Sequence, residues 1–521
     1  MRKRLLRVLA GAVSLMLFTA SFTACSGGST NGKEKDTQNA ATVEEKKPLA
    51  PVDLVWYVVA DPHKDQKMVD DEVNKRLKND LNCTVKLNFT SWTEWQTKYN
   101  LLLASGEKID MIFSATWANF TKYARGGAFM DLKEMLPKYA PKTWAAVPKE
   151  DWQWVTYNGK IFAVPCTTYE FTPSGLYYRE DLRKKYNLPE IKDVASIEAY
   201  LDGIKKNEKG MTPIGGNPNN EIYSIFLNSA KFETIQGAET SLLQATSYNT
   251  PRDIVAFPMT SQFENYVKKM KEWADKGYWS KDAISSKASP QNEMNAGKAA
   301  IAWMNPATAR GKFQGYEKDH PDWEMGYFPL SRMKGYAMPN SPINNGMSIP
   351  KSAANPERSL MVLDLFRNDL NYWRLTTWGI EGYHWQVSDD GKKKISPAKG
   401  QDPKVNPGFW TTSWGWNVDK NNLPPEKDWK GWDALNSEFQ GMKKPNIFAG
   451  IYIDYDPIKT EQAAINDVKS KYEGALIMGL VPDPDKTLKE YREKLKAAGL
   501  DKYVTEIKKQ VDQYFTEVGV K

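Results

Sequence analysis

The chain of 521 residues is poor in the residue types on which most metal and thiol chemistry depends. It contains three histidines and three cysteines, and these do not cluster, which argues against a zinc or haem site. No run of alternating Asp and Asn with a bidentate acid at the right distance predicts a calcium loop. We therefore expect no metal and no cofactor. Cys83 and Cys166 can pair in an exported chain, but two lone cysteines are not a disulfide framework, and we favour two small buried hydrophobic residues.

A strong charge of one sign is also missing. The formal net charge is +7, but four of the positive charges lie within the first seven residues, which leaves about +3 on the remainder. That balance is not typical of a nucleic-acid-binding protein. The sequence has no Gly-x-Ser-x-Gly motif and no phosphate-binding loop. It therefore lacks the usual signatures of α/β-hydrolases and of P-loop nucleotide-binding enzymes.

Long hydrophobic runs are absent apart from one near the N-terminus. Basic residues precede the apolar run GAVSLMLFTA (11–20), which is too short to span a membrane comfortably and is typical of a signal peptide over residues 1–24. The next residues, FTAC (22–25), resemble a bacterial lipobox, although Phe22 stands where Leu is usual. This predicts lipidation of Cys25; the alternative is an ordinary signal peptide followed by a chance cysteine. Polar and charged residues dominate 25–50, which we expect to be a flexible tether on the outer face of a membrane.

The remaining chain has enough apolar residues for real cores. Hydrophobic residues make up 41% of the sequence, and the length predicts two or three packed units or two lobes built from interleaved segments. The 19 tryptophans are too many to be deeply buried throughout. Some of them are therefore expected to face a cleft or the surface.

The first part of this region has the pattern of alternating strands and helices. Apolar or alternating runs predict strands, and residues spaced by three or four predict helices, over 53–60, 66–81, 84–90, 92–102 and 109–115 in the order βαβαβ. That order predicts a parallel sheet with right-handed crossovers. Ligands of such sheets bind beyond the carboxyl ends of the strands, which makes Asp61 and Trp117 candidate site residues.

A second unit begins near residue 170. It contains a strand that leads into a helix at 176–181, helices at 195–208 and 262–276 and a strand at 298–305, and residues 347–366 then return to strand followed by helix. The segments VPCTTYEFTPSG and MPNSPINNG are rich in Pro, Gly, Asn and Thr, as hinge-like crossovers between lobes would be. Two amphipathic helices are predicted near the C-terminus.

Several stretches together resemble a known family. They are the lipobox, the block VNKRLKNDLNCTVKLNFTSWTEWQTKYNLLLASGEKIDMIFSATW, GGAFMDLKEML with YNGKIFAVP, AAIAWMN, WGIEGYHW, and the C-terminal run from IDYDPIK to DQYF. The chain thus resembles the oligosaccharide-binding lipoproteins of ATP-driven importers, in a Gram-positive subgroup with its own C-terminal module. The resemblance covers nearly all of the mature chain, and it rests on order and spacing rather than on one motif.

The resemblance implies an α/β, two-lobed, periplasmic-binding-protein-like fold of type II. Each lobe is expected to hold a mainly parallel sheet flanked by helices, with a helical C-terminal extension. The expected division is 51–168 for the first part of lobe 1, 169–340 for lobe 2, 341–378 for a return to lobe 1, and 379–521 for the rest of lobe 2 and the helical module. The implied partners are an oligosaccharide and an importer permease, for a monomeric protein that does no covalent chemistry.

A sugar site needs aromatic faces beside carboxylates and amides. Pyranose rings have apolar C–H faces that stack on aromatic rings, and their hydroxyls exchange hydrogen bonds with Asp, Glu and Asn. Residues of these types at strand ends and on crossovers are the candidates: Asp61, Trp117, Tyr169, Glu170, Trp303, Asn305, Trp378, Glu381, Tyr383, His384 and Trp414. Trp303 is as compatible with a core position, and Asp61 with a simple turn.

The octapeptide WGIEGYHW (378–385) allows two interpretations. Its tryptophans can be packing residues, and His384 can be a structural hydrogen-bonding group. Alternatively, the two glycines argue for a loop in which Glu381 binds a sugar hydroxyl, since a buried carboxylate needs such a partner. We expect the second, and a similar contribution from the loop 409–417.

Two other functions stay open at this point. Glu170 and Glu381 can be the paired carboxylates of a lipid-anchored glycoside hydrolase. The same fold can also bind a non-sugar solute such as a peptide.

Overall fold

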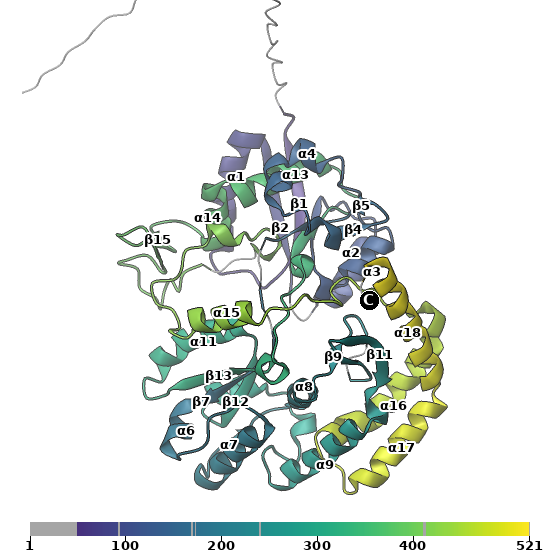
Figure 1. Ribbon diagram of the computed structural model, residues 1–521. Helices are drawn as coiled ribbons and strands as arrows, with labels where there is room; N and C mark the ends of the chain where they lie inside the picture. The colour runs from purple at the N-terminus through teal and green to yellow at the C-terminus, as the bar shows by residue number, and fades with distance from the viewer. Residues whose placement is uncertain are drawn as a thin grey trace, which may run out of the picture. The chain divides into compact units, whose positions relative to one another are not determined.

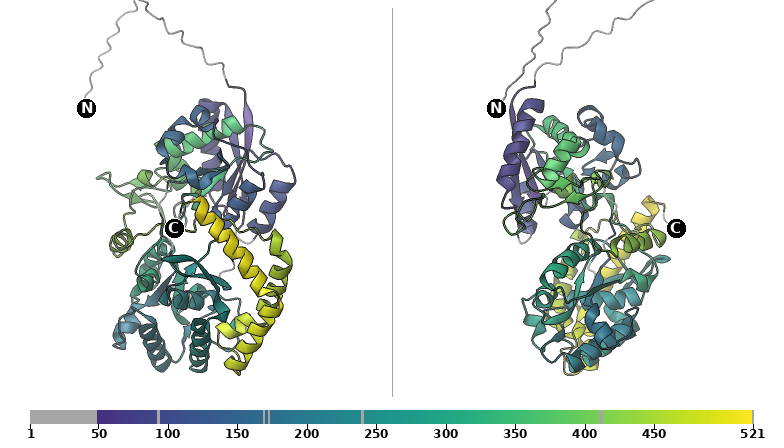
Figure 2. Two further views of the ribbon diagram at one scale, coloured as in Figure 1. Left: turned by 45° about the vertical axis from the view of Figure 1, so that its right-hand side comes forward. Right: turned by 90° about the vertical axis from the view of Figure 1, so that its left-hand side faces the viewer.

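The computed structural model describes residues 49–519, except 92–93, 168–169, 172, 239–240 and 410–412. Residues 49 onward form one compact unit. Two large hydrophobic cores lie within it, and they define two lobes (Figures 1 and 2). Cys25 and its surroundings lie outside the described residues. Within those residues, no helix is both long enough and apolar enough to cross a membrane.

The first lobe is built on a five-stranded sheet in the order β2-β1-β3-β14-β6. Its strands are β1 (Val52–Val59), β2 (Cys83–Thr90), β3 (Met111–Ser114), β14 (Gly346–Ser348) and β6 (Val164–Pro165). β1 pairs in parallel with both β2 and β3, as the βαβαβ pattern predicts. β14 and β6 then extend the sheet in antiparallel pairs.

Helices of the expected type cover this sheet. α1 (Gln66–Leu81) buries Val69, Val73 and Leu77, which confirms the spacing of four. The other helices of this lobe are α2 (Trp95–Ala104), α3 (Phe120–Arg125), α4 (Leu136–Tyr139), α5 (Pro141–Ala146), α13 (Pro356–Asn368) and α14 (Leu370–Trp378). A small hairpin of β4 (Thr156–Tyr157) and β5 (Lys160–Ile161) completes it.

The second lobe has a four-stranded sheet in the order β13-β7-β12-β8. Its strands are β7 (Gly175–Arg179), β8 (Thr212–Ile214), β12 (Ala299–Met304) and β13 (Met325–Pro329). β7 runs antiparallel to both of its neighbours, and only β12 and β8 pair in parallel. The expectation of a mainly parallel sheet is therefore wrong for this lobe. β7 enters from the crossover segment and lies between two strands that run the other way.

Helices and a small antiparallel sheet surround this second sheet. The helices are α6 (Glu180–Lys185), α7 (Val194–Asn207), α8 (Asn219–Ser229), α9 (Ser261–Asp275), α10 (Pro290–Asn295), α11 (Pro306–Asp319), α12 (Ser331–Lys334) and α15 (Trp432–Gly441). β9 (Glu233–Thr234), β10 (Leu243–Ser247) and β11 (Thr250–Ala256) form the small sheet.

The C-terminal extension is helical, as expected. α16 (Lys459–Ile477), α17 (Pro484–Ala497) and α18 (Leu500–Glu517) form the yellow-green to yellow edge of Figure 1. Their buried residues belong to the second-lobe core.

The segment after residue 378 packs with the first lobe. Phe409 and Trp416 lie in the first-lobe core, while Trp378, Trp385 and Val418 form a satellite cluster with Trp373 of α14. The expected domain boundary at residue 379 places Phe409 and Trp416 in the second lobe, whereas both pack in the first. The hairpin of β15 (Gln386–Val387) and β16 (Lys394–Ile395) belongs to the same segment.

Candidate ligand-binding site

A cavity of about 1000 Å³ lies where segments of both lobes meet. We call it the inter-lobe cavity. Second-lobe residues from the starts of α11 and α15 line one side, and Trp378, the β15–β16 hairpin and residues 417–428 line the other. Glu170 and Phe171, on the first crossover, complete the lining. Carboxylates, amides and aromatic rings therefore converge from several segments.

Two carboxylates face this cavity from adjacent segments. Thr167 forms a parallel bridge with Val418, and the Asp419 N–H donates to the carbonyl of Thr167 at 3.4 Å. This pairing brings Asp419 close to Glu170, which is half-buried. Burial, and then the nearby charge of Asp419, raise the pKa of the Glu170 carboxyl. The pair is thus held by backbone pairing in a position that favours strong hydrogen-bond donors as ligands.

The opposite side of the cavity is fixed by an ion pair at the start of α11. Asn305 caps this helix by accepting a hydrogen bond from the Thr308 N–H at 2.8 Å, and Pro306 follows at the first helical position. One turn on, Arg310 makes a bidentate contact with Asp428. The Arg310 guanidinium also lies 4.5 Å from the ring centroid of Trp432. Asn305 is thus a structural cap directly beside the cavity, and Arg310 orients the Trp432 ring at its wall.

Trp378 lines the cavity but is not free to stack. It is 3% exposed and packs edge-on against Trp373 and Trp385, with ring centroids 5.1 and 4.9 Å away. The Lys394 ammonium lies 5.2 Å from its centroid and the Arg374 guanidinium 5.6 Å. These neighbours occupy most of the ring, so Trp378 acts chiefly as a rigid support.

The rest of the octapeptide 378–385 is a packed turn. The His384 side chain is fully buried; its Nδ1 accepts from the Ile380 N–H at 2.9 Å, and its Nε2 lies 3.3 Å from Asp65. Trp385 donates from Nε1 to the carbonyl of Gly379. Burial lowers the pKa of His384, which favours the neutral ring in this structural role.

Glu381 and Tyr383 do not line the inter-lobe cavity. Glu381 is exposed at the tip of the turn. The Tyr383 carbonyl accepts from Asn406 Nδ2 at 2.7 Å and helps to tie the turn to the following loop. The structure therefore favours packing for this octapeptide over the ligand-gripping loop that its composition suggested.

Two exposed tryptophans are hydrogen-bonded near the end of β3 and the start of β14. Trp117 is 37% exposed and Trp414 is 42% exposed. Trp117 donates from Nε1 to the carbonyl of Asn344 at 2.8 Å. The Cys166 N–H donates to the carbonyl of Asn345, the residue that follows Asn344. The Cys166 thiol donates to the carbonyl of Trp414 at 2.7 Å. Both tryptophans are thus anchored to the start of β14.

The backbone at Trp414 approaches this strand very closely. A Cβ atom at Gly415 would overlap the Met347 sulfur, so the position requires glycine. Cys166 is a buried free thiol, as is Cys83, and burial raises the pKa of Cys166 to about 12. The Cys166–Trp414 hydrogen bond and the Thr167–Val418 bridge place residues 166–167 beside residues 414–418, so Trp414 lies on the segment that leads to Asp419.

Asp61 and Trp303 lie apart from the inter-lobe cavity. Asp61 is exposed just beyond β1. Trp303 is 5% exposed in the second-lobe core, where its carbonyl accepts from Gln291 at 2.9 Å. Tyr169 lies outside the described residues. Within those residues, no group of histidine, cysteine and acidic side chains is arranged to hold a metal ion.

Sequence reasoning missed Asp419, Arg310 and Trp432. A usable signal was the run NVDKNN (417–422), in which amides and an acid directly follow a tryptophan-rich loop.

Known proteins share both the sequence pattern and the fold. Residues 72–361, more than half of the chain, match the family described as bacterial extracellular solute-binding protein. Residues 447–516 match a domain of unknown function, DUF3502.

Relatives resemble the chain along most of its length. It is 22% identical to a carbohydrate ABC transporter substrate-binding protein of Streptococcus pneumoniae serotype 4, over 96% of this chain and 97% of that protein. It is 23% identical to the polygalacturonan/rhamnogalacturonan-binding protein YtcQ of Bacillus subtilis, over 72% of this chain and 75% of that one. The solved structure of the N-glycan transport solute binding protein NgtS from Streptococcus pneumoniae superposes with a TM-score of 0.74 at 19% identity, and the match covers 90% of this chain and 99% of that one. This likeness confirms the expected two-lobed solute-binding fold.

Proposed function

Since the chain belongs to the family of bacterial extracellular solute-binding proteins, we propose that it captures an oligosaccharide in the inter-lobe cavity. It then delivers the sugar to the membrane permease of an ABC importer. Its relatives include carbohydrate-, polygalacturonan/rhamnogalacturonan- and N-glycan-binding proteins, which supports this ligand class.

One observation carries the proposal: the Glu170–Asp419 pair faces a cavity of about 1000 Å³ that also holds amides and the Trp432 ring. A sugar presents many hydroxyl donors, and carboxylates accept from them in bidentate geometry. Aromatic walls cover the apolar ring faces. We assign hydroxyl binding to Glu170, Asp419 and Asn417, and ring contact to Trp432.

The exposed tryptophans extend this site for a longer ligand. Trp414 lies on the segment that leads to Asp419 and is hydrogen-bonded to Cys166. Trp117 is hydrogen-bonded to Asn344, the neighbour of the residue that binds the Cys166 N–H. A chain of several sugar units can cover both places, whereas a monosaccharide fills only one. We therefore propose an oligosaccharide rather than a single sugar.

Titration calorimetry with a panel of neutral and acidic oligosaccharides tests the proposal. Glu170→Gln keeps the shape of the side chain but removes its charge, and it should weaken binding of the sugar that wild type binds. Glu490→Gln, at an exposed position of α17, is the matched control and should bind as wild type does. Stabilisation of the protein by peptides but by none of the sugars would refute the assignment.

A glycoside hydrolase remains the second candidate because of one observation. A carboxyl group with a raised pKa beside a second carboxylate is the arrangement of an acid and its partner in such enzymes. The pair is Glu170 and Asp419, since Glu381 does not line the cavity. Incubation of the bound oligosaccharide with stoichiometric protein decides: intact sugar supports binding alone, and turnover supports the hydrolase.

The proposed anchor is a lipid on Cys25, followed by the tether to residue 50, which places a monomeric binding unit on the extracellular face. The family's extracellular nature and the lipobox resemblance of FTAC support it. Cys25→Ala should release the protein from the membrane fraction into the medium. Retention in the membrane fraction would refute the lipid anchor and leave the sugar site untouched.

A further inference from the structure

Residues 447–516, which match a domain of unknown function, are anchored firmly in the second lobe. Phe448, Ile451 and Ile453 lie in its core together with the buried residues of α16, α17 and α18. The Gly450 N–H also donates to the Tyr514 hydroxyl. We call this region the C-terminal module. It is part of the second lobe because it shares that lobe's core.

The same module contacts the first lobe at one residue above all. Arg125, the last residue of α3, has its guanidinium 5.1 Å from the ring centroid of Tyr157 and 5.5 Å from that of Tyr452. Tyr157 belongs to the first lobe and Tyr452 to the module. Beside them, a Cβ at Gly450 would stand 3.2 Å from the ring of Trp154, another first-lobe residue. Figure 1 shows the end of α18 next to α3.

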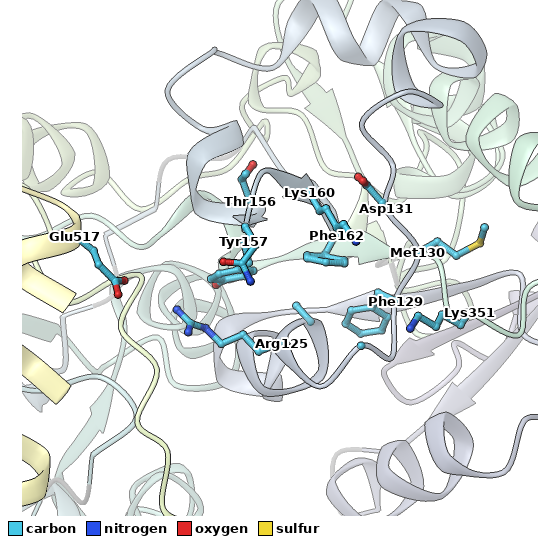
Figure 3. Close-up of a pocket in the computed structure, with 13 residues that line it drawn as sticks. Arg125, Phe129, Met130, Asp131, Thr156, Tyr157, Lys160, Phe162, Lys351 and Glu517 are labelled. Carbon is cyan, nitrogen blue, oxygen red and sulfur yellow. The ribbon is translucent and has the colours of Figure 1, made fainter. Parts of the chain in front are cut away.

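This contact is flanked by open space on both sides. Arg125 and Glu517 both line a cavity of about 970 Å³ and another of about 350 Å³. Figure 3 shows Arg125 extending from its helix toward Glu517 and Tyr157. The bridge therefore consists of a few side chains around an exposed arginine and is no continuation of either core. Such a contact can break without unfolding either lobe.

We propose that the C-terminal module is a strap that grips the first lobe through Arg125 and sets the separation of the two lobes before ligand arrives. The lobes are otherwise joined by crossover segments, which permit rotation. The strap adds a non-covalent contact that favours one arrangement and must rearrange when the lobes move. Its effect on sugar affinity rests on the proposed function, but its effect on lobe separation does not.

The expected size of the effect follows from the kind of contact. Of the two cation–π contacts of Arg125, only that with Tyr452 joins the two lobes, and one exposed cation–π contact changes the ratio of two conformations by about two- to five-fold. A ligand that binds one arrangement better would have its affinity changed by up to the same factor when the strap is removed.

Distance measurements between spin labels test the strap without any ligand. Labels are placed at Lys75→Cys in α1 and Lys206→Cys in α7, both exposed, in a Cys25→Ser background. Cys83 and Cys166 are buried and should therefore not be labelled. Arg125→Ala and Tyr452→Ala should each shift or broaden the distance distribution in the same way. The double variant should add little, because both changes break one contact.

Two further variants make the result specific. Lys122→Ala, exposed on the same helix, should leave the distribution unchanged. Arg125→Lys keeps the charge but loses the planar group, and it should lie between wild type and Arg125→Ala. Distributions identical in wild type and Arg125→Ala would overturn the strap. Failure of every sugar to bind would instead refute the proposed function and leave the distance result standing.

Discussion

Two tryptophan-bearing loops of this protein have similar composition and different roles. Residues 378–385 and 413–419 each combine tryptophans, glycine and one acid. In the first, the tryptophans are buried and the acid, Glu381, lies in solvent. In the second, Trp414 is exposed and the acid, Asp419, faces the inter-lobe cavity. The tertiary partners of a loop, and not its residue types, decide whether it packs into a core or faces a cavity.

The largest effect is expected from breaking the packed loop. Trp385 is 2% exposed and supports Trp378, so Trp385→Ala should lower the free energy of unfolding by about 3–5 kcal/mol. Urea denaturation followed by circular dichroism measures this loss. An unchanged midpoint would show that the octapeptide does not hold the fold together.

Removing the charge of Glu170, the neighbour of Asp419, should lower sugar affinity rather than stability. Glu170→Gln removes a charged acceptor, and hydrogen bonds to charged groups contribute about 1.5–3 kcal/mol. Sugar affinity should therefore fall about 10- to 100-fold in calorimetry. A variant that binds as wild type does would move the site away from the Glu170–Asp419 pair.

A smaller loss of affinity is expected from the exposed tryptophan. Trp414→Ala removes a stacking face, which contributes about 0.5–1.5 kcal/mol, and its exposure means that the unfolding midpoint should stay near wild type. Calorimetry with a long and a short oligosaccharide gives the measurement. We expect a loss of a few-fold for the long ligand; an equal loss for both would place Trp414 elsewhere in the site.

The raised pKa of Glu170 predicts a pH effect on stability in the absence of ligand. Its carboxyl ionises at lower pH in the unfolded chain than in the folded protein. The folded state is therefore favoured below the unfolded pKa, and that contribution is lost as the pH rises toward the folded pKa. Glu170→Gln should be more stable than wild type at pH 7 and equal to it near pH 3. Equal differences at both pH values would contradict the shift.

The smallest effect is expected at the tip of the packed loop. Glu381 is exposed and outside the cavity lining, so Glu381→Ala should change both sugar affinity and unfolding free energy very little. A large loss of affinity would restore the ligand-binding interpretation that the octapeptide's composition first favoured.

Local patterns were enough to predict much of the fold. The apolar runs and helical spacing of residues 52–114 determine β1, α1, β2, α2 and β3, because each element buries one face against its neighbours. The direction of β7 between β12 and β13 was not predictable in this way. Strand direction depends on how distant segments pack together. It cannot be read from the alternation of apolar and polar residues along one strand.

A site residue was predictable from the sequence only where the order of strands and crossovers placed it near the cleft. Glu170 was found because it lies on a crossover, which both lobes approach. Asp419 was missed because its place depends on the bridge between Thr167 and Val418, far apart in sequence. Likewise, His384 in the octapeptide 378–385 is buried against Asp65, a contact between distant segments that no local pattern predicts.

The close approach of Gly415 to Met347 has an evolutionary consequence. The backbone beside Trp414 is held by a position that admits no side chain, whereas Trp414 itself projects into solvent. Descendants of this sequence are free to exchange the aromatic ring for other groups while the glycine keeps the loop in place. Under the proposed function, new sugar preferences can therefore arise here by single substitutions, without rebuilding the scaffold.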